Sequence, residues 1–179
     1  MTEALSNTGP SDALAAPGWA YRRGLTTVDG VAAGEWGVEE SRDAAAVMDA
    51  IHRYVWAYDD RNLPAVTEIF AEEVTWTVVV GPDDAGLTHS GRPAVLAWMS
   101  EALEAQLEQR RHAVVNERVL RPGPENAQVL FTMLLFTTGG ATQSLAAAGF
   151  YRVDLVRRDG GWLITHIDSG FDAPAGVLS

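Results

Sequence analysis

The apolar positions in the first third of the chain predict a long amphipathic helix. Val47, Ile51, Tyr54 and Tyr58 recur at spacings of three and four, so they share one helical face. Ser41 is a good N-cap for this helix. A plain core stripe would carry leucine and valine at all four positions, so the two phenol groups mark this face as a place to look for a site.

Two aspartates stand where this helix should end. A carboxylate at a helix C-terminus opposes the negative end of the helix dipole. Asp59 and Asp60 occupy that position. Another group must therefore compensate for the carboxylate, or the helix must end just before it.

The later segments change from helical to strand-like periodicity. After a break at Asn62, a short second helix is expected, and a third helix opens at the SGRP sequence. β-branched and aromatic runs separated by turn-forming residues indicate strands. The expected helices are 41–60, 63–70 and 91–107; the expected strands are 73–80, 87–90, 110–120, 127–138, 142–157 and 162–170.

This order of elements predicts an α+β fold. The last three strands have short connections, so they should form an antiparallel meander. Glycines within the long strands favour strong bending, and helices on the concave side of a curved sheet leave a cone-shaped cavity for a small molecule. We assign 1–40 to an N-terminal extension, 41–174 to the domain and 175–179 to a C-terminal tail.

The extension itself is not uniform. Residues 1–18 are rich in Ala, Ser, Gly, Pro and Thr and are interpreted as a mobile tail. The following segment carries Trp19 and Trp36 between glycines. We favour an arm that packs its aromatic side chains on the domain; a lid over the pocket and an arm exchanged with a partner subunit are the alternatives.

Composition and charge restrict the classes of partner and chemistry that are expected for this chain. The 179 residues are 47% hydrophobic, with a formal net charge of −11 and a pI near 4.6. An acidic chain is repelled by phosphate backbones and anionic membranes, so neither nucleic acid nor a membrane is expected as a partner. The absence of cysteine excludes disulfides and thiolate chemistry and is compatible with the cytoplasm. No signal peptide or membrane-spanning run is recognised.

Four segments resemble one known family. They are RYVWAYDDRNLPAVTEIFAEEVTW, HSGRPAVLAWM, RRHAVVNERV and GFYRVDLVRRDGGWLITHI, spread over 43–172. Together they resemble the SnoaL-like branch of the nuclear transport factor 2-like superfamily, which is similar to scytalone dehydratase, bile acid 7α-dehydratase and polyketide cyclases. The resemblance implies a cone-shaped α+β barrel with three helices on a curved, mostly antiparallel sheet. Its members include dehydratases, isomerases, cyclases, epoxide hydrolases and noncatalytic subunits.

The resemblance points to a histidine and an aspartate as the catalytic pair. His112, at the start of a strand after the third helix, matches the acid/base histidine of the dehydratases, and imidazole can accept and donate a proton near neutral pH. Tyr54 and Asp59 match a tyrosine and an aspartate of bile acid 7α-dehydratase. The Tyr58–Asp59 pair resembles that of scytalone dehydratase. Asp59 would orient the histidine, and the alternative is a solvated helix end.

A second polar pair stands on the last strand. His166 and Asp168 are two residues apart and are expected on the same side as Trp162 and Ile164. The bile acid enzyme has an arginine in its last strands, and no arginine follows Arg158 here. In the resemblance to scytalone dehydratase, the position of that enzyme's pocket asparagine corresponds to Tyr151. The second histidine of that enzyme has no counterpart on the middle strand of this chain. His166 is expected to substitute for it as a second acid.

Other side chains complete the predicted pocket. Trp76, His89, Asn116 and Tyr151 are assigned to substrate binding, together with Tyr58 and Asp168; Asn116 should share the strand face of His112. His52 falls off the apolar helical face and should be exposed. His112, His166 and Asp168 have the composition of a facial triad, but no local ligand motif supports a metal, and no cofactor motif is present.

The sequence thus favours a cofactor-independent dehydratase, cyclase or isomerase that acts on a hydrophobic polyketide-like metabolite. One alternative is a noncatalytic ligand-binding or assembly subunit of the same fold. Another is an epoxide hydrolase that recruits Asp59, Arg92 and Asp168. The run at 129–136 is apolar on both strand faces, which favours a homodimer.

Overall fold

The computed structural model describes residues 17–26, 36–120 and 123–173. Its helices and strands follow the predicted order, with one additional short helix in the N-terminal arm. The helices are α1 (Trp19–Arg22), α2 (Val38–Asp59), α3 (Leu63–Ile69) and α4 (Arg92–Glu104). The strands are β1 (Phe70–Val80), β2 (Leu87–Ser90), β3 (Gln109–Val119), β4 (Asn126–Gly139), β5 (Thr142–Arg158) and β6 (Gly161–Phe171). No helix in the described ranges has the length and apolarity needed to cross a bilayer.

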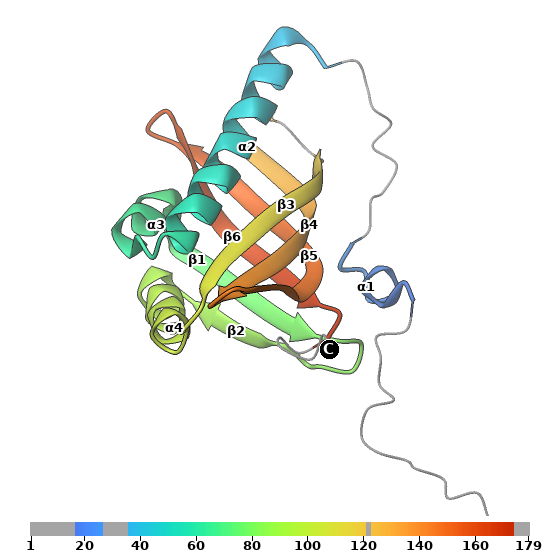
Figure 1. Ribbon diagram of the computed structural model, residues 1–179. Helices are drawn as coiled ribbons and strands as arrows, with labels where there is room; N and C mark the ends of the chain where they lie inside the picture. The colour runs from blue at the N-terminus through green and yellow to red at the C-terminus, as the bar shows by residue number, and fades with distance from the viewer. Residues whose placement is uncertain (1–16, 27–35, 121–122, 174–179) are drawn as a thin grey trace, which may run out of the picture.

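The six strands form one curved, unclosed sheet with α2, α3 and α4 packed on it (Figure 1). The strand order is β2-β1-β6-β5-β4-β3. The last three strands, β4, β5 and β6, form an antiparallel meander, as predicted, and β3 extends it by antiparallel pairing with β4; β1 pairs with β6 in parallel. The expected α+β class with helices on a curved sheet is therefore confirmed, and β3 is left as an edge strand beside α2.

The core lies between α2 and the concave face of the sheet. Val47 and Ile51 are fully buried, and Tyr54 is nearly so. They pack against alternate residues of the long strands, such as Phe131 and Ile164, which are also fully buried or nearly so. The 3.6-residue period of the helix and the two-residue period of the strands meet at this surface.

The start of α2 differs from the prediction. The helix begins at Val38, with Gly37 rather than Ser41 as the N-cap. The Gly37 N–H donates to Glu40 Oε2 at 2.6 Å, and the Ser41 hydroxyl donates to the Gly37 carbonyl oxygen at 2.9 Å. A glutamate carboxylate thus satisfies one of the first free amides, and a negative charge near a helix N-terminus is favourable.

The described part of the N-terminal arm docks on the outer face of the sheet. Trp19 is buried against Phe150, with ring centroids 5.8 Å apart, and its indole N–H donates to Asp172 Oδ1 at 2.7 Å. Trp36, in contrast, is exposed. The docked α1 contributes no residue to the lining of the cavity described below. Residues 1–16 of the predicted mobile tail (1–18) lie outside the described residues, as do residues 27–35 of the arm and the C-terminal tail at 175–179.

A close approach of two strands fixes the sheet beneath Trp19. A Cβ atom at Gly149 would lie 2.0 Å from the Gly170 carbonyl oxygen, and one at Gly170 would lie 2.2 Å from Phe150 Cε1. Only glycine fits at these two positions of the paired strands β5 and β6. The absence of side chains at these glycines leaves room for Phe150 and Trp19 to pack together over the sheet.

We therefore expect Gly149→Ala to lower the free energy of unfolding by roughly 2 kcal/mol or more, because the backbone of β6 must move away. Urea denaturation followed by circular dichroism measures the change. Gly139→Ala is the matched control, since its Cβ would have only Glu108 Cβ at 4.0 Å as a neighbour. Equal losses in the two variants would show that the close approach is not the cause.

Candidate active site

A cavity of about 280 Å³ lies between the helices and the concave face of the sheet. Aromatic and aliphatic side chains form most of its wall, and the polar groups come from α2, β3, β5 and β6. The lining residues are Tyr54, Tyr58, Trp76, Val78, Val80, Trp98, Ala102, Arg110, His112, Leu135, Ala147, Tyr151, Ser169 and Phe171. An apolar cavity with a few convergent polar groups is the usual form of a small-molecule site.

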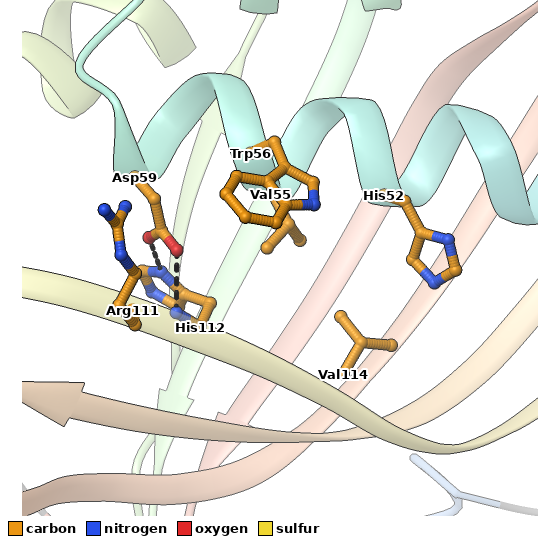
Figure 2. A pocket seen from close by; sticks show the side chains of 7 residues that line it. All are labelled: His52, Val55, Trp56, Asp59, Arg111, His112 and Val114. Atoms are coloured by element: carbon orange, nitrogen blue, oxygen red, sulfur yellow. Dashed lines mark hydrogen bonds and ion pairs between the residues drawn. The ribbon is translucent and has the colours of Figure 1, made fainter.

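Asp59 and His112 form a hydrogen-bonded pair (Figure 2), and the His112 side chain lines the cavity. Asp59 Oδ1 lies 2.5 Å from His112 Nδ1, and Asp59 Oδ2 accepts the backbone N–H of His112 at 2.9 Å. The side chains are 4% and 12% exposed. A carboxylate accepts but does not donate, so Nδ1 carries the proton and Nε2 is the nitrogen left for a bound molecule.

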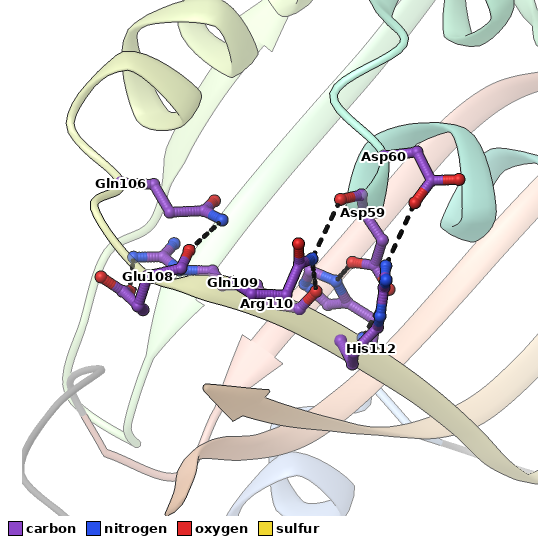
Figure 3. A network of polar contacts seen from close by, with 8 residues as sticks. Asp59, Asp60, Gln106, Glu108, Gln109, Arg110 and His112 are labelled. Atoms are coloured by element: carbon purple, nitrogen blue, oxygen red, sulfur yellow. Dashed lines mark hydrogen bonds and ion pairs between the residues drawn. The ribbon is translucent and has the colours of Figure 1, made fainter. Parts of the chain in front are cut away.

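These two hydrogen bonds also compensate for the unfavourable position of the Asp59 carboxylate at the C-terminus of α2. Figure 3 shows β3 running past the end of α2, tied to it by side chains of both elements. Gln109 Nε2 donates to the Asp59 carbonyl oxygen at 3.3 Å, and Arg111 pairs with Asp60 at 3.2 Å. The end of the helix therefore receives N–H donors and a cation from the edge strand, which offset the unfavourable placement.

His112 also borders a second depression, which Asp59 lines as well. A groove of about 270 Å³ runs between α2 and β3 on the side away from the cavity, and Figure 2 shows His52 and Trp56 of α2 along it. Its lining is His52, Val55, Trp56, Asp59, Arg111, His112 and Val114. His112 thus stands in the wall between the groove and the cavity. His52 is exposed, as predicted.

Three tyrosines of the cavity keep their protons at neutral pH. Burial raises the pKa of Tyr54 well above its ordinary value, and burial likewise raises the pKa of Tyr151. Burial also raises the pKa of Tyr58, although the nearby Arg110 guanidinium opposes the rise. Tyr58 stacks on Tyr54 and lies with its ring centroid 5.6 Å from that of His112. The phenols are therefore hydrogen-bond donors at the site.

A tryptophan-rich wall faces these tyrosines. Trp76 meets Trp98 edge-on at 5.0 Å and Tyr151 at 6.0 Å between ring centroids, and its indole N–H donates to Ser169 Oγ at 2.9 Å. His89 does not line the cavity. Its ring stacks on Trp98 at 4.7 Å and so supports that wall from behind.

His166 and Asp168 lie on the outer face of the sheet, so the prediction that they share a side with Trp162 and Ile164 is wrong. His166 pairs with Asp154 and Ile164 with Leu155, which leaves Thr165 without an opposite residue. This β-bulge reverses the alternation of β6. Ile167 and Ser169 consequently point inward, and Ser169 reaches the cavity.

The outer-face pair has its own partners. His166 Nδ1 lies 2.5 Å from the Thr75 hydroxyl, and His166 Nε2 lies 3.0 Å from Asp168 Oδ1. Arg152 donates to the other oxygen of Asp168. The facial triad considered from the sequence is therefore not assembled, because His112 lies at the cavity and the other two residues on the opposite face.

Asn116 also departs from its predicted face. It adopts a left-handed backbone conformation with φ of 57° and is exposed. Val115 pairs with Thr132 and Arg118 with Leu130, so Asn116 and Glu117 together oppose a single residue of β4. This second bulge takes Asn116 out of line with His112. Asn tolerates the left-handed region better than most residues, which was the signal available in the sequence.

The residues named for an epoxide hydrolase are not gathered at one place. Arg92 donates to the Phe70 carbonyl oxygen at 3.1 Å and pairs with Glu72 at 3.5 Å. Asp168 is on the outer face, while Asp59 holds His112. Conversely, sequence reasoning missed Arg110, Trp98 and Ser169 as lining residues. Arg110 was detectable, because it stands two residues before His112 on one strand.

The family and the fold are established by comparison with known proteins. A sequence model of the SnoaL-like domain matches residues 39–168. An NTF2-like protein with a cystatin-like fold from Novosphingobium aromaticivorans superposes with a TM-score of 0.61 at 20% identity, covering 73% of this chain and 82% of that one. Comparison with curated proteins gave no match.

Two further structures from the same organism share the fold. A proposed scytalone dehydratase superposes with a TM-score of 0.61 at 18% identity, covering 74% of this chain and 86% of that one. The beta subunit of a proposed aromatic-ring-hydroxylating dioxygenase superposes with a TM-score of 0.63 at 14% identity, covering 75% and 94%. At these identities the likeness carries the fold and not the activity.

The outer-face pair predicts a pH-dependent contribution to stability. The hydrogen bond to Asp168 raises the pKa of His166 above its ordinary value of 6.5. Burial alone would raise the pKa of Asp168, but His166 and Arg152 outweigh it and hold that pKa below 3.8. The raised pKa of His166 stabilises the fold fully below pH 6.5, and this effect is lost as pH rises through the raised pKa. The lowered pKa of Asp168 stabilises the fold above pH 3.8, and this effect is lost as pH falls through the lowered pKa.

We therefore expect Asp168→Asn to lower the free energy of unfolding most between pH 3.8 and pH 6.5, where both effects are present. The loss at about pH 5.5 should exceed that at about pH 9 by roughly 1 kcal/mol, a small figure because both groups are partly exposed to solvent. Urea denaturation at the two pH values gives the difference. Asp49→Asn, which removes an exposed partner of Arg53, is the control and should show no such pH dependence. A loss of equal size at both pH values would contradict the linkage.

Proposed function

The chain belongs to the SnoaL-like domain family, and on that premise we propose that it is a cofactor-independent acid–base enzyme. It would act as a dehydratase, cyclase or isomerase on a hydrophobic small molecule of the polyketide type or another secondary metabolite. The observation that carries the proposal is the 2.5 Å contact between Asp59 Oδ1 and His112 Nδ1 at the wall of an aromatic-lined cavity.

His112 is the general base in this proposal. Asp59 holds the proton on Nδ1, so the Nε2 lone pair takes a proton from a carbon next to a substrate carbonyl. The C–H electron pair moves into a new carbon–carbon double bond, and the carbonyl oxygen becomes an enolate oxygen. The buried Asp59 carboxylate stabilises the imidazolium that forms, as an orienting carboxylate does in a catalytic triad.

A phenol of the cavity supports the enolate oxygen. Tyr54, Tyr58 and Tyr151 are protonated donors, and the Tyr58 ring contacts the His112 ring in a tilted arrangement. A preorganised donor aimed at developing negative charge lowers the barrier without any reorganisation. Tyr58 is therefore our choice for this role, with Tyr54 stacked behind it.

The second half-reaction returns the proton. The imidazolium gives its Nε2 proton to a leaving hydroxyl, which departs as water as the enolate pair expels it, or to another carbon in an isomerisation. His166 was expected to supply a second acid, but it faces the opposite side of the sheet. His112 alone serves as base and then acid in this proposal.

The alternative of a noncatalytic binding or assembly subunit has a different structural expectation. It favours an interior plugged by side chains, with the histidine in solvent. The cavity of about 280 Å³ and a His112 side chain only 12% exposed favour the enzyme instead.

Proton abstraction can be tested without knowing the natural substrate. We expect the protein to accelerate hydrogen–deuterium exchange at the α-carbon of bicyclic aryl ketones such as 1-tetralone and 2-tetralone in deuterated buffer, followed by NMR. His112→Gln should reduce the enzymatic rate by about 100-fold or more, because it removes the base. Asp59→Asn should reduce the rate by roughly 10-fold or more, because it removes the carboxylate that orients the base.

His52→Gln is the matched control, since this histidine lines the groove and not the cavity. Circular dichroism of each variant verifies the fold. Unchanged exchange in a folded His112→Gln protein would remove this histidine from the mechanism. Exchange no faster than in buffer with the unaltered protein would argue against acid–base catalysis on such ketones.

The proposal includes a homodimer formed through the outer sheet face. Leu130 and Leu134 of β4 alternate with the buried residues of that strand, and both are half-buried. Leu130 already packs beside Trp19 and Phe150, so Leu134 is the position that we assign to the contact with a partner subunit. An apolar position on an otherwise open sheet face is typical of a contact between subunits.

We expect Leu134→Glu to convert a dimer into monomers in sedimentation velocity experiments, because the new charge would be buried without a partner. Gln143→Glu, at an exposed position of β5, should leave the dimer intact. A monomer for the unaltered protein would refute this part of the proposal.

A further inference from the structure

We propose that Arg110 makes the cavity selective for molecules that carry a carboxylate on an aromatic or polycyclic skeleton. This inference rests on the proposed function and narrows its substrate class. It starts from the side chains that line the cavity and from the orientation of one guanidinium group among them.

The cavity lining carries basic but no acidic side chains, although the chain as a whole is strongly acidic. The full sequence has a formal net charge of −11, yet the lining of the cavity contains no aspartate or glutamate. Its ionisable members, apart from tyrosines, are Arg110 and His112. Asp59 lies close by, but both of its oxygens are bound to His112 and it lines the groove side. A mostly apolar, low-dielectric wall strengthens the field of the single permanent cation.

The guanidinium of Arg110 is held in place and still has donors to offer. Nε donates a hydrogen bond to Glu108 Oε1 at 3.0 Å, and Nη2 lies 2.9 Å from the same oxygen. No described residue accepts a hydrogen bond from Nη1 of Arg110. The side chain is 29% exposed, so this edge can be reached by a ligand. Arginine is the side chain best suited to bind a carboxylate through several N–H groups at once.

The segment before β3 builds this arrangement (Figure 3). Gln106 is buried, and its Nε2 donates to the Glu108 carbonyl oxygen at 2.8 Å. Arg61, which follows α2, donates to the Gln106 carbonyl oxygen at 2.5 Å. The position of Glu108, and through it the guanidinium of Arg110, is therefore set by the packing of α2 and the end of α4.

Arg110 stands at the right place relative to the proposed base. Arg110 and His112 are two residues apart on β3, and both line the cavity, so their Cα atoms are roughly 7 Å apart. The positive charge of Arg110 also acts on the nearby phenol of Tyr58, because it opposes the rise that burial causes in the pKa of Tyr58. A carboxylate at Arg110 would place the rings of a ligand against Trp76 and Trp98 and a nearby carbon at His112 Nε2.

Matched pairs of aryl carboxylates and carboxamides test the selectivity. We would measure dissociation constants by isothermal titration calorimetry at pH 7.5 and 0.1 M salt for benzoate and benzamide and for 2-naphthoate and 2-naphthamide. The carboxylate of at least one pair should bind about 10-fold more tightly than its amide. Arg110→Gln should bring that ratio to about 1 by weakening only the carboxylate. Arg110→Lys, which keeps the charge but not the fork of donors, should retain part of the ratio.

Two control variants separate this inference from the proposed function. Arg111→Gln removes the same charge one residue away, at the groove rather than the cavity, and should keep the ratio. His112→Gln should also keep the ratio even though it removes the proposed base. Failure of the ketone exchange with a preserved ratio would overturn the acid–base proposal alone. Equal affinity for carboxylate and amide, affinity for neither, or equal loss in Arg110→Gln and Arg111→Gln would overturn the assignment of Arg110.

Discussion

Burial of the Asp59 carboxylate at the C-terminal end of α2 is the constraint on which the site depends. A carboxylate there is disfavoured both by the helix dipole and by loss of water. Both of its oxygens are satisfied by one residue of the edge strand, through the backbone N–H and the ring of His112. The same contact therefore fastens β3 to α2 and fixes the tautomer of His112, with the proton on Nδ1. The stability of the edge strand and the orientation of the imidazole have a single origin.

The curvature of the sheet forms the cavity beside the Asp59–His112 contact. Long strands joined by tight turns wrap around α2, and the pair of glycines at positions 149 and 170 lets β5 and β6 approach closely under Trp19. The aromatic side chains divide between the two faces as a result. Trp76, Trp98 and Tyr151 line the cavity, whereas Trp19 and Phe150 pack together on the outer face. The arm thus braces the sheet from behind.

The periodicity of the sequence was sufficient for most of the fold, and the family resemblance supplied the central pair of the candidate site. Helical spacing placed Tyr54 and Tyr58 on the buried face, and the family resemblance correctly paired Asp59 with His112. The misplacements arose where a strand gains one residue. Period-two reasoning assumes an unbroken strand, and neither Thr165 nor Asn116 carries a side chain that marks a bulge unambiguously. The start of α2 was missed for another reason, because Glu40 caps the helix from within its first turn.

The bulge at Thr165 has a consequence for how this chain could diverge. It separates a stretch of β6 that packs Trp162 and Ile164 inward from a stretch that packs Ile167 and Ser169 inward. Because Thr165 has no opposite residue on β5, its deletion would bring Ile164 and His166 together in the pairing that Leu155 and Asp154 already set. Ile164 would still face inward and His166 outward, so both stretches would keep their faces. The strand can therefore lose one residue at this position while the polarity of the interior, the strand order and the Asp59–His112 contact stay as they are.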